Sequence, residues 1–272
     1  MMTDTPFFDI AAYYNASADS EWGRLARDAY HQLEFQLTMH FLCKYLPPEG
    51  VILDAGGGPG RYTLALCRLG YEVVLLDLAE GLLARAREQL AQEPAEVQAR
   101  VRDIVQGDIR DLSAFPDGAF AATLCLGCPL AHIHDEAERR HAMSELARVT
   151  KDGGIIAVSV VGLLAAHRID AWKFDGRFLL DDAYMARILR EQNSTRWHFF
   201  RAAELRALAE SAGLATLEMA GLESLATGLP DATNRLCENP VQRQRWLDLL
   251  LRYATEPAVV DMAEHMLYIG RK

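Results

Sequence analysis

A run of glycines directly after a short, mostly apolar segment constrains the fold of this chain more than any other feature. Residues 51–55 (VILDA) are followed at once by Gly56-Gly57-Gly58-Pro59-Gly60. Glycine lets the backbone turn sharply and lets a ligand approach the main chain, since no Cβ stands in the way. The first turn of a helix after the loop would offer unpaired N–H groups to that ligand. The segment therefore predicts a strand, a ligand-binding loop and a helix.

The spacing of these glycines differs from that of a dinucleotide-binding loop. That loop has the pattern G-x-G-x-x-G, in which the third glycine allows close packing of helix and strand. With Gly56 and Gly58 as the first two glycines, the third position holds Arg61. Asp54 stands just before the loop, where a carboxylate suits a positively charged cofactor better than a pyrophosphate. An NAD(P)-dependent oxidoreductase is therefore the alternative rather than the favoured interpretation.

The rest of the chain predicts an α/β fold with a parallel sheet, because short apolar runs alternate with helical patterns. Strands are expected over residues 51–55, 71–77, 101–106, 119–126, 155–161, 215–222 and 265–270, with a turn at 151–154. Helices are expected over residues 61–69, 79–91, 135–149 and 202–212. We also expect a helical, aromatic-rich N-terminal cap segment (1–45) and a main domain (46–272) with cap insertions at about 162–200 and 224–262.

Acidic residues follow the second and third predicted strands. Asp77 ends one strand, 23 residues after Asp54, and Asp108 comes directly after the next. The carboxyl ends of parallel strands meet at one edge of the sheet, where open α/β folds bind ligands. We expect Asp77 to accept hydrogen bonds from the hydroxyls of a ribose. Asp108 could accept one from an adenine amino group, with Ile109 packed on the ring.

Together these motifs resemble the class I S-adenosylmethionine-dependent methyltransferases. The similarity lies in VILDAGGGPGRYTLALCRLGYEVVLLDLAEGLLARARE, QGDIRDL and FAATLCLGCPLAHI, and later in HFFRAAELRALAESAGL and EHMLYIGRK. It is greatest with the small-molecule branch that includes ubiquinone-biosynthesis-type enzymes. The resemblance implies a Rossmann-like, mostly parallel seven-stranded sheet with an antiparallel last strand, and S-adenosylmethionine as cofactor.

The resemblance also implies which residues contact the cofactor. Carried over by position, Gly56, Gly58 and Gly60 would line the methionine end of the cofactor, with Asp54 near its amino group. Asp77 would bind the ribose, and Leu126 would lie near the sulfonium. Leu78 would contact the adenine face, and Asp108 and Ile109 the adenine edge. Ala55 belongs to the same loop. Tyr14 is a candidate for a lid, and Arg61 reaches the cofactor carboxylate or lies on the helix surface.

Methyl transfer is an in-line displacement, so much of the catalysis is alignment and desolvation. A general base is needed only if the acceptor must lose a proton, and His132 and His198 are the candidates, with a packing role as the alternative for each. Gly127-Cys128-Pro129-Leu130 replaces the Asn/Asp-Pro-Pro-aromatic motif of enzymes that methylate amino groups of nucleic-acid bases. Cys125 and Cys128 have the spacing of half a zinc site, but no second pair follows, so we expect no metal.

Charge and composition favour a small-molecule acceptor. The chain has 28 basic and 38 acidic residues, a net charge of −10, which repels nucleic acid. Its longest apolar run, residues 155–166, is shorter than the ~20 residues of a membrane-spanning helix, so we expect no membrane partner. The five cysteines form no disulfide pattern, and the N-terminus resembles no signal peptide, which predicts a cytoplasmic protein. Nothing predicts an oligomeric state, and a non-catalytic S-adenosylmethionine-binding regulator stays a further alternative.

Overall fold

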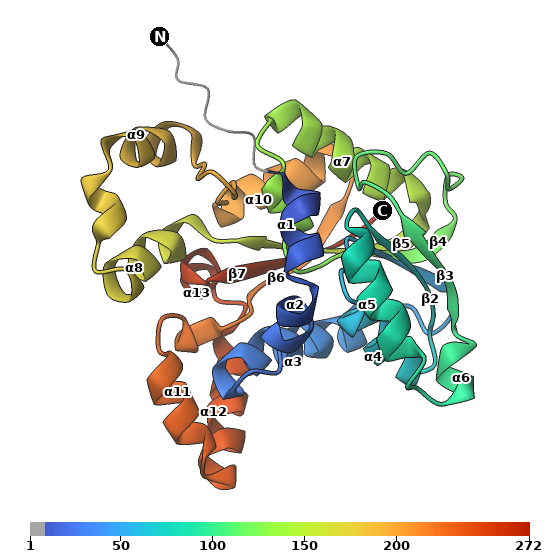
Figure 1. Ribbon diagram of the computed structural model, residues 1–272, viewed down its shortest axis with the longest axis horizontal. Helices are drawn as coiled ribbons and strands as arrows, with labels where there is room; N and C mark the ends of the chain where they lie inside the picture. Colours follow the sequence, from blue (N-terminus) through green and yellow to red (C-terminus); the bar gives the residue numbers. More distant parts are fainter. Residues whose placement is uncertain (1–8) are drawn as a thin grey trace.

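The computed structural model describes residues 9–272, and within them a seven-stranded sheet lies between two layers of helices (Figure 1). The strands follow the order β3-β2-β1-β4-β5-β7-β6, and β7 runs antiparallel to both of its neighbours. Their bounds are β1 (Val51–Ala55), β2 (Glu72–Asp77), β3 (Val101–Gln106), β4 (Phe120–Cys125), β5 (Thr150–Val161), β6 (Ala215–Gly221) and β7 (His265–Arg271). The predicted fold class, a Rossmann-like sheet with an antiparallel last strand, is confirmed.

Both faces of the sheet are covered, as the nearly continuous apolar runs require. In β1, Ile52 and Leu53 belong to different apolar cores on opposite faces, and every residue of β4 is buried. One core is built with α3 (Ala29–Tyr45), α4 (Arg61–Arg68) and α12 (Pro240–Tyr253), and the other with α7 (Glu136–Val149), α10 (Ala202–Ser211) and α13 (Pro257–Met262). Helix α5 (Glu80–Leu90) packs against β2 and β3 through Leu83 and Ala86, and the short α6 (Ala95–Gln98) precedes β3.

The turn expected over residues 151–154 is instead part of β5. The strand begins at Thr150, and its pairing with β4 shifts register between Phe120 and Ala122. At the other edge, the Gly153 N–H donates to the Lys272 carbonyl (2.9 Å) and the Lys272 N–H to the Gly154 carbonyl (3.1 Å). These two hydrogen bonds to Lys272 hold residues 153 and 154 in the sheet, although their sequence is typical of a turn.

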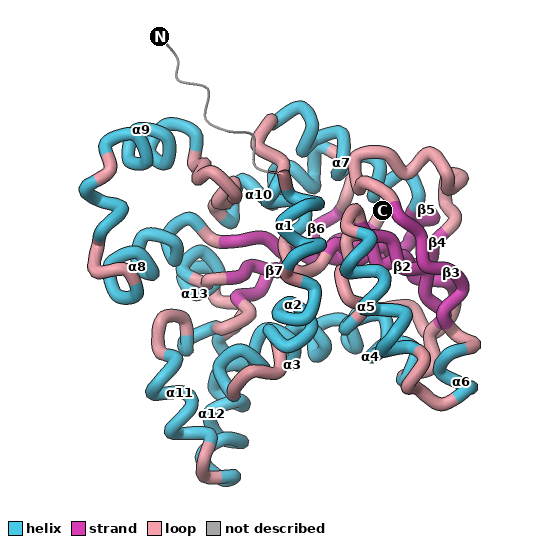
Figure 2. The backbone as a smooth tube through the Cα atoms, viewed as in Figure 1, coloured by secondary structure: helices cyan, strands magenta, loops and turns pink. Residues whose placement is uncertain are grey.

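The segments outside the sheet are helical (Figure 2). They comprise α1 (Ile10–Ala16) and α2 (Ala18–Arg24) near the N-terminus, α8 (Leu163–Lys173), η2 (Arg177–Leu180) and α9 (Asp182–Glu191) after β5, η1 (Pro129–His132) after β4, and η3 (Ser224–Ala226) and α11 (Pro230–Cys237) after β6. Residues 1–8 of the predicted cap segment lie outside the described residues. The division into a cap segment, a main domain and two insertions stays a proposal. None of the described helices combines the length and hydropathy needed to span a membrane.

Candidate active site

A cavity of about 570 Å³ lies where the loops after β1, β2, β3 and β4 meet. The predicted residues that line it are Tyr14, Gly56, Gly58, Arg61, Asp77, Leu78, Asp108, Ile109, Leu126 and His132. Four predicted residues lie outside the lining: Asp54, Ala55, Gly60 and His198. The cavity falls within the usual size of a site for a small molecule or cofactor, roughly 300–1,000 Å³.

The glycine loop forms one wall of this cavity. Gly56 has φ +75°, a left-handed conformation that glycine adopts without strain. A Cβ at this position would lie 2.4 Å from Cγ of Pro129, which follows β4. The Gly56 N–H donates to the Leu76 carbonyl at the end of β2 (2.7 Å), which fixes the loop against the neighbouring strand. The close approach of two loops at this point therefore requires a residue without a side chain.

Asp77 shapes the glycine loop from the end of β2. One carboxylate oxygen accepts a hydrogen bond from the Gly58 N–H (2.8 Å), and the other accepts one from the Ala79 N–H (2.9 Å). Burial raises the pKa of Asp77 to about 6, and these two backbone donors oppose the increase. Asp77 thus orders the loop and also presents carboxylate lone pairs at the cavity wall.

Asp54 lies directly behind the loop rather than in the cavity. It is fully buried, and a Cβ at Gly57 would lie 2.5 Å from its Cγ. Thr63 donates to Oδ2 (2.6 Å), whereas Oδ1 has no hydrogen-bond partner within residues 9–272. Burial raises the pKa of Asp54 to about 6, with the Thr63 hydrogen bond opposing it and the charge of Asp77 adding to it. This buried carboxylate is poised to favour a cation on the other side of the loop.

The loop after β3 forms the next part of the wall. Asp108 and the buried Ile109 both line the cavity, as predicted. The Asp108 carboxylate also accepts from the Arg110 N–H (2.9 Å) and forms an ion pair with its guanidinium (2.6 Å). An adenine amino group would therefore share this carboxylate with Arg110. Leu78, partly exposed after β2, offers an apolar surface nearby.

His132, Tyr14 and Arg196 form a hydrogen-bonded group at the wall. The His132 Nδ1 lies 3.1 Å from the Arg196 carbonyl, so the proton belongs on Nδ1, and Nε2 accepts from the Tyr14 hydroxyl (2.9 Å). Burial lowers the pKa of His132 to about 4 and raises that of Tyr14 to about 12. The histidine is therefore neutral at pH 7, and the lone pair on its Nε2 accepts the hydrogen bond from the Tyr14 hydroxyl.

Arg196 completes this group from the other side. Its guanidinium donates to the Tyr14 hydroxyl oxygen (2.8 Å) and lies over the rings of Tyr13 and Trp197, 4.1 and 4.5 Å from their centroids. Trp197 in turn stacks on His132 at 4.0 Å. Sequence reasoning missed Arg196, and the aromatic residues beside it were the only signal that this segment returns to the cavity.

Two predicted residues occupy positions that change their interpretation. Arg61, at the start of α4, lines the cavity, but its guanidinium stacks over Trp22 (4.4 Å) and donates to the Trp22 carbonyl. His198 is buried away from the lining, with its ring nitrogens bonded to Asn193 Oδ1 (2.8 Å) and Glu204 Oε1 (2.6 Å). Because both nitrogens of His198 have partners in the protein, its surroundings favour a packing role over the proposed catalytic one.

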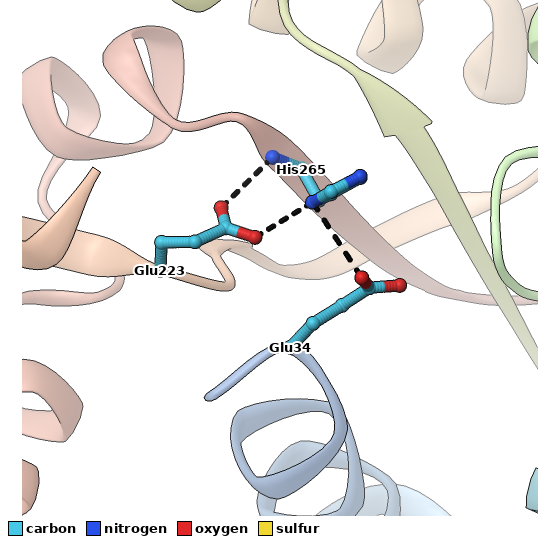
Figure 3. Close-up of side chains that lie close together, drawn as sticks. All are labelled: Glu34, Glu223 and His265. Atoms are coloured by element: carbon cyan, nitrogen blue, oxygen red, sulfur yellow. Dashed lines mark hydrogen bonds and ion pairs between the residues drawn. The ribbon is translucent and has the colours of Figure 1, made fainter. Parts of the chain in front are cut away.

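A buried charge network that the sequence did not predict joins the cavity wall to the first residue of β7, and Figure 3 shows Glu34, Glu223 and His265 of this network. Arg24 lines the cavity and forms an ion pair with Glu34 of α3 (2.6 Å). His265 lies between Glu34 (3.7 Å) and Glu223 (2.6 Å). Burial alone would lower the pKa of His265, but the two carboxylates outweigh it and raise the pKa to about 10. Burial would raise the pKa of Glu34, yet Arg24 and His265 lower it to about 2.

This network also bears on the prediction of no metal. Ligand atoms of Glu34, Glu223 and His265 lie within 4.8 Å of one another. However, the guanidinium of Arg24 and the imidazolium of His265 already balance two carboxylates, so the arrangement resembles an ion-pair network more than a metal centre. Cys125 and Cys128, which have the spacing of half a zinc site, are both buried. Burial raises the pKa of the Cys125 thiol to about 12.

Comparison with known proteins adds the family to this geometry. Residues 52–154 match the family described as a methyltransferase domain. A ubiquinone biosynthesis O-methyltransferase of Xanthomonas axonopodis pv. citri (strain 306) is 28% identical over 187 residues, 68% of this chain and 72% of that protein. A protein of Encephalitozoon cuniculi (strain GB-M1), named as a methyltransferase, is 34% identical over 126 residues, 46% of this chain and 52% of that protein.

A glycine/sarcosine N-methyltransferase of Parasynechococcus marenigrum (strain WH8102) is 33% identical over 122 residues, 43% of this chain and 40% of that protein. The chain thus spans about half or less of the length of the last two relatives. The solved structure of a methyltransferase from Methanosarcina mazei shares the fold, with a TM-score of 0.58 and 19% identity over 85% of this chain and 96% of that one. The domain match, these relatives and the fold agree. Residues 52–154 are a methyltransferase domain of the class I S-adenosylmethionine-dependent kind, and its cofactor is S-adenosylmethionine.

Proposed function

We propose that this chain transfers the methyl group of S-adenosylmethionine to a nucleophilic atom of a small molecule that binds in the cavity. One observation carries the proposal: the glycine loop, Asp77, Asp108 and His132, which are far apart in the sequence, line the same cavity. The names of two relatives, one for ubiquinone biosynthesis and one for glycine and sarcosine, support a small acceptor. The net charge of −10 also favours such an acceptor over nucleic acid.

Features of the cavity fit S-adenosylmethionine. Gly56, Gly57 and Gly58 line the cavity, and because they have no side chains a ligand can lie against their backbone. The buried, unpaired Oδ1 of Asp54 is an acceptor and a negative charge behind that loop, which suits a cationic ligand. We therefore assign the ribose hydroxyls to Asp77, the adenine to Asp108 and Ile109, and the methionine end to the glycine loop.

When bound, S-adenosylmethionine supplies an electrophilic methyl group on a good leaving group. The contribution of this chain is then to align the acceptor and to exclude water. Tyr14, His132 and Leu126 line the cavity for this purpose. A histidine with a pKa near 4 is a weak base at pH 7, and its Nε2 is engaged by Tyr14. We therefore infer that His132 positions the Tyr14 hydroxyl, which in turn faces the acceptor, rather than removing a proton itself.

Calorimetry with S-adenosylhomocysteine and with NAD tests the cofactor assignment. We expect micromolar binding of S-adenosylhomocysteine and none of NAD. Asp77→Ala is expected to weaken that binding by about 2–3 kcal/mol, or roughly 30- to 150-fold, because a charge-assisted contact is lost. Asp77→Asn, which keeps the side-chain volume, checks that the loss is not simply misfolding. Asp152→Ala is the matched control, since the Asp152 side chain is 98% exposed.

Transfer itself requires a second measurement. The protein is incubated with methyl-labelled S-adenosylmethionine and a metabolite extract, and labelled products are sought. Tight binding of NAD without S-adenosylhomocysteine, or an unchanged affinity in Asp77→Ala, contradicts the cofactor assignment. Binding of S-adenosylhomocysteine without any labelled product instead makes the chain a non-catalytic cofactor-binding protein.

A further inference from the structure

Two arginines on one wall of the cavity have no acidic partner. Arg187 of α9 and Arg196, which follows that helix, both line the cavity. Within residues 9–272, neither forms an ion pair with a carboxylate, whereas Arg24 and Arg110 on other walls are each held by one at 2.6 Å. The chain carries ten more acidic than basic residues. Arg61, the fifth arginine of the lining, also has no carboxylate partner in the described part of the chain, but it stacks on Trp22 and donates to the Trp22 carbonyl. Arg187 and Arg196 are thus positive charges that an anion from outside the chain can balance.

Arg196 is held rigidly while part of its donor set stays unused. The guanidinium lies over the rings of Tyr13 and Trp197 and donates one hydrogen bond, to the Tyr14 hydroxyl. Its Nε is buried and has no hydrogen-bond partner in the described part of the chain. A ligand that accepts from this nitrogen would remove the free-energy cost of a buried, unpaired donor.

Nearby histidines indicate the sign of the local field. Burial lowers the pKa of His132 to about 4, and the charge of Arg196 lowers it further. Burial also lowers the pKa of His134, and the charge of Arg187 is among the further causes. Both histidines line the cavity, and neither can supply a negative charge to balance the arginines. Glu191 also lines it but forms no ion pair with Arg187, although the two are four residues apart on α9.

We propose that the methyl acceptor carries a carboxylate or phosphate group, and that Arg187 and Arg196 bind it. The inference rests on the proposed methyl transfer for the identity of the ligand, but the anion site itself stands on the arginines. A guanidinium presents planar, paired donors that match the oxygens of a carboxylate or a phosphate. In a cavity shielded from water, such a pairing is stronger than at the surface. The first insertion thereby selects anionic acceptors.

The test uses inorganic phosphate as the probe, with the protein saturated with S-adenosylhomocysteine. Phosphate is titrated by calorimetry at constant ionic strength, with chloride as the non-binding salt. Arg187→Gln and Arg196→Gln are each expected to weaken phosphate binding by about tenfold or more. Arg190→Gln is the matched control, because this arginine is on the same helix, exposed and outside the lining. Within the described residues, Arg187 has no hydrogen bond or ion pair to lose, so its replacement tests the site even if Arg196→Gln perturbs Tyr14.

The affinity for S-adenosylhomocysteine distinguishes the acceptor from the cofactor as the source of the anion. We expect it to stay within about twofold of the parent in both variants, a difference below 0.5 kcal/mol. If it falls with phosphate binding, the arginines hold the cofactor's own carboxylate and the proposal is wrong. The proposal is also overturned if the parent protein binds phosphate no more tightly than chloride, or if both variants bind phosphate as tightly as the parent does.

A second arm uses a metabolite extract separated on an anion exchanger before incubation with methyl-labelled cofactor. We expect labelled product from the retained, anionic fraction. Product only from the unretained fraction refutes an anionic acceptor. No product from any fraction counts against the proposed methyl transfer, while the phosphate titration still decides whether the arginines form an anion site.

Discussion

Replacing Asp54 with asparagine is expected to stabilise the ligand-free protein at alkaline pH while weakening cofactor binding. Asp54 is fully buried with one unpaired oxygen, and its pKa is raised from 3.8 to about 6. A carboxyl group whose pKa is higher in the folded than in the unfolded state stabilises the fold at low pH. That contribution is lost as the pH rises through about 6. Asparagine has no proton to lose, so this part of the pH dependence should vanish in the variant.

The size of the effect follows from the shift. A difference of about two pKa units corresponds to roughly 3 kcal/mol between pH 4 and pH 8, at 1.36 kcal/mol per unit. For a domain of this size, this is about 5–10 °C in the melting temperature. One polar atom of the asparagine amide would take the position of Oδ1 and would also lack a hydrogen-bond partner. This costs free energy, but by the same amount at every pH. The informative quantity is therefore the change with pH in the stability difference between variant and parent.

Urea unfolding of Asp54→Asn and the parent at pH values from 4.5 to 8.5, without ligand, measures that difference. We expect it to move in favour of the variant as the pH rises, with most of the change complete by about pH 6. Asp152→Asn, at an exposed position, should show no such trend. Calorimetry at pH 7.5 should show S-adenosylmethionine bound about tenfold more weakly by Asp54→Asn, since a charge behind the loop is gone. A stability difference that is flat with pH to within about 1 kcal/mol would refute the reasoning.

The remaining predictions concern the glycine loop and the buried network. Gly56→Ala and Gly153→Ala both place a side chain at φ near +75°, at a cost of about 1–2 kcal/mol each, but only Gly56 also meets Pro129. Thermal unfolding and calorimetry should therefore show Gly56→Ala as the less stable of the two and as the one that loses S-adenosylhomocysteine binding; equal behaviour would contradict the close approach. Glu34→Gln removes the carboxylate that pairs with Arg24 and lies 3.7 Å from His265, and should destabilise the protein by about 3–5 kcal/mol in urea unfolding. Exposed Glu96→Gln is its control, and a loss as small as the control's would show that the network is not held by charge.

The sheet and half of the site were predictable because their signals are local. Strands β1 and β3 match the predicted bounds, since each is a short run between turn residues. Asp77 and Asp108 meet at one cavity because parallel strands end at the same edge, so predicting the sheet predicts the meeting.

The rest depends on contacts between distant segments. The turn expected at Gly153 became strand because Lys272, at the other end of the chain, pairs with it. Arg196 bonds to Tyr14, 182 residues earlier, and the aromatic residues around position 196 do not indicate which residue it contacts. The network of Glu34 and His265 likewise joins α3 to β7, and neither residue belongs to a motif.

Helix α1 forms part of the cavity wall through Tyr14, yet none of its residues is buried. Its described contacts are mostly polar or between a charge and a ring: the Tyr14 hydroxyl bonds to Arg196 and His132, the Arg196 guanidinium lies over the Tyr13 ring, and Asn15 Oδ1 accepts from the Gly81 N–H of α5 (2.7 Å). A segment that buries little apolar surface separates from a protein at a small fraction of the free energy of global unfolding. The cavity can therefore be entered and emptied while the sheet remains intact. The speed at which products leave and the durability of the fold are consequently separate properties, which substitutions in this helix can tune without weakening the core.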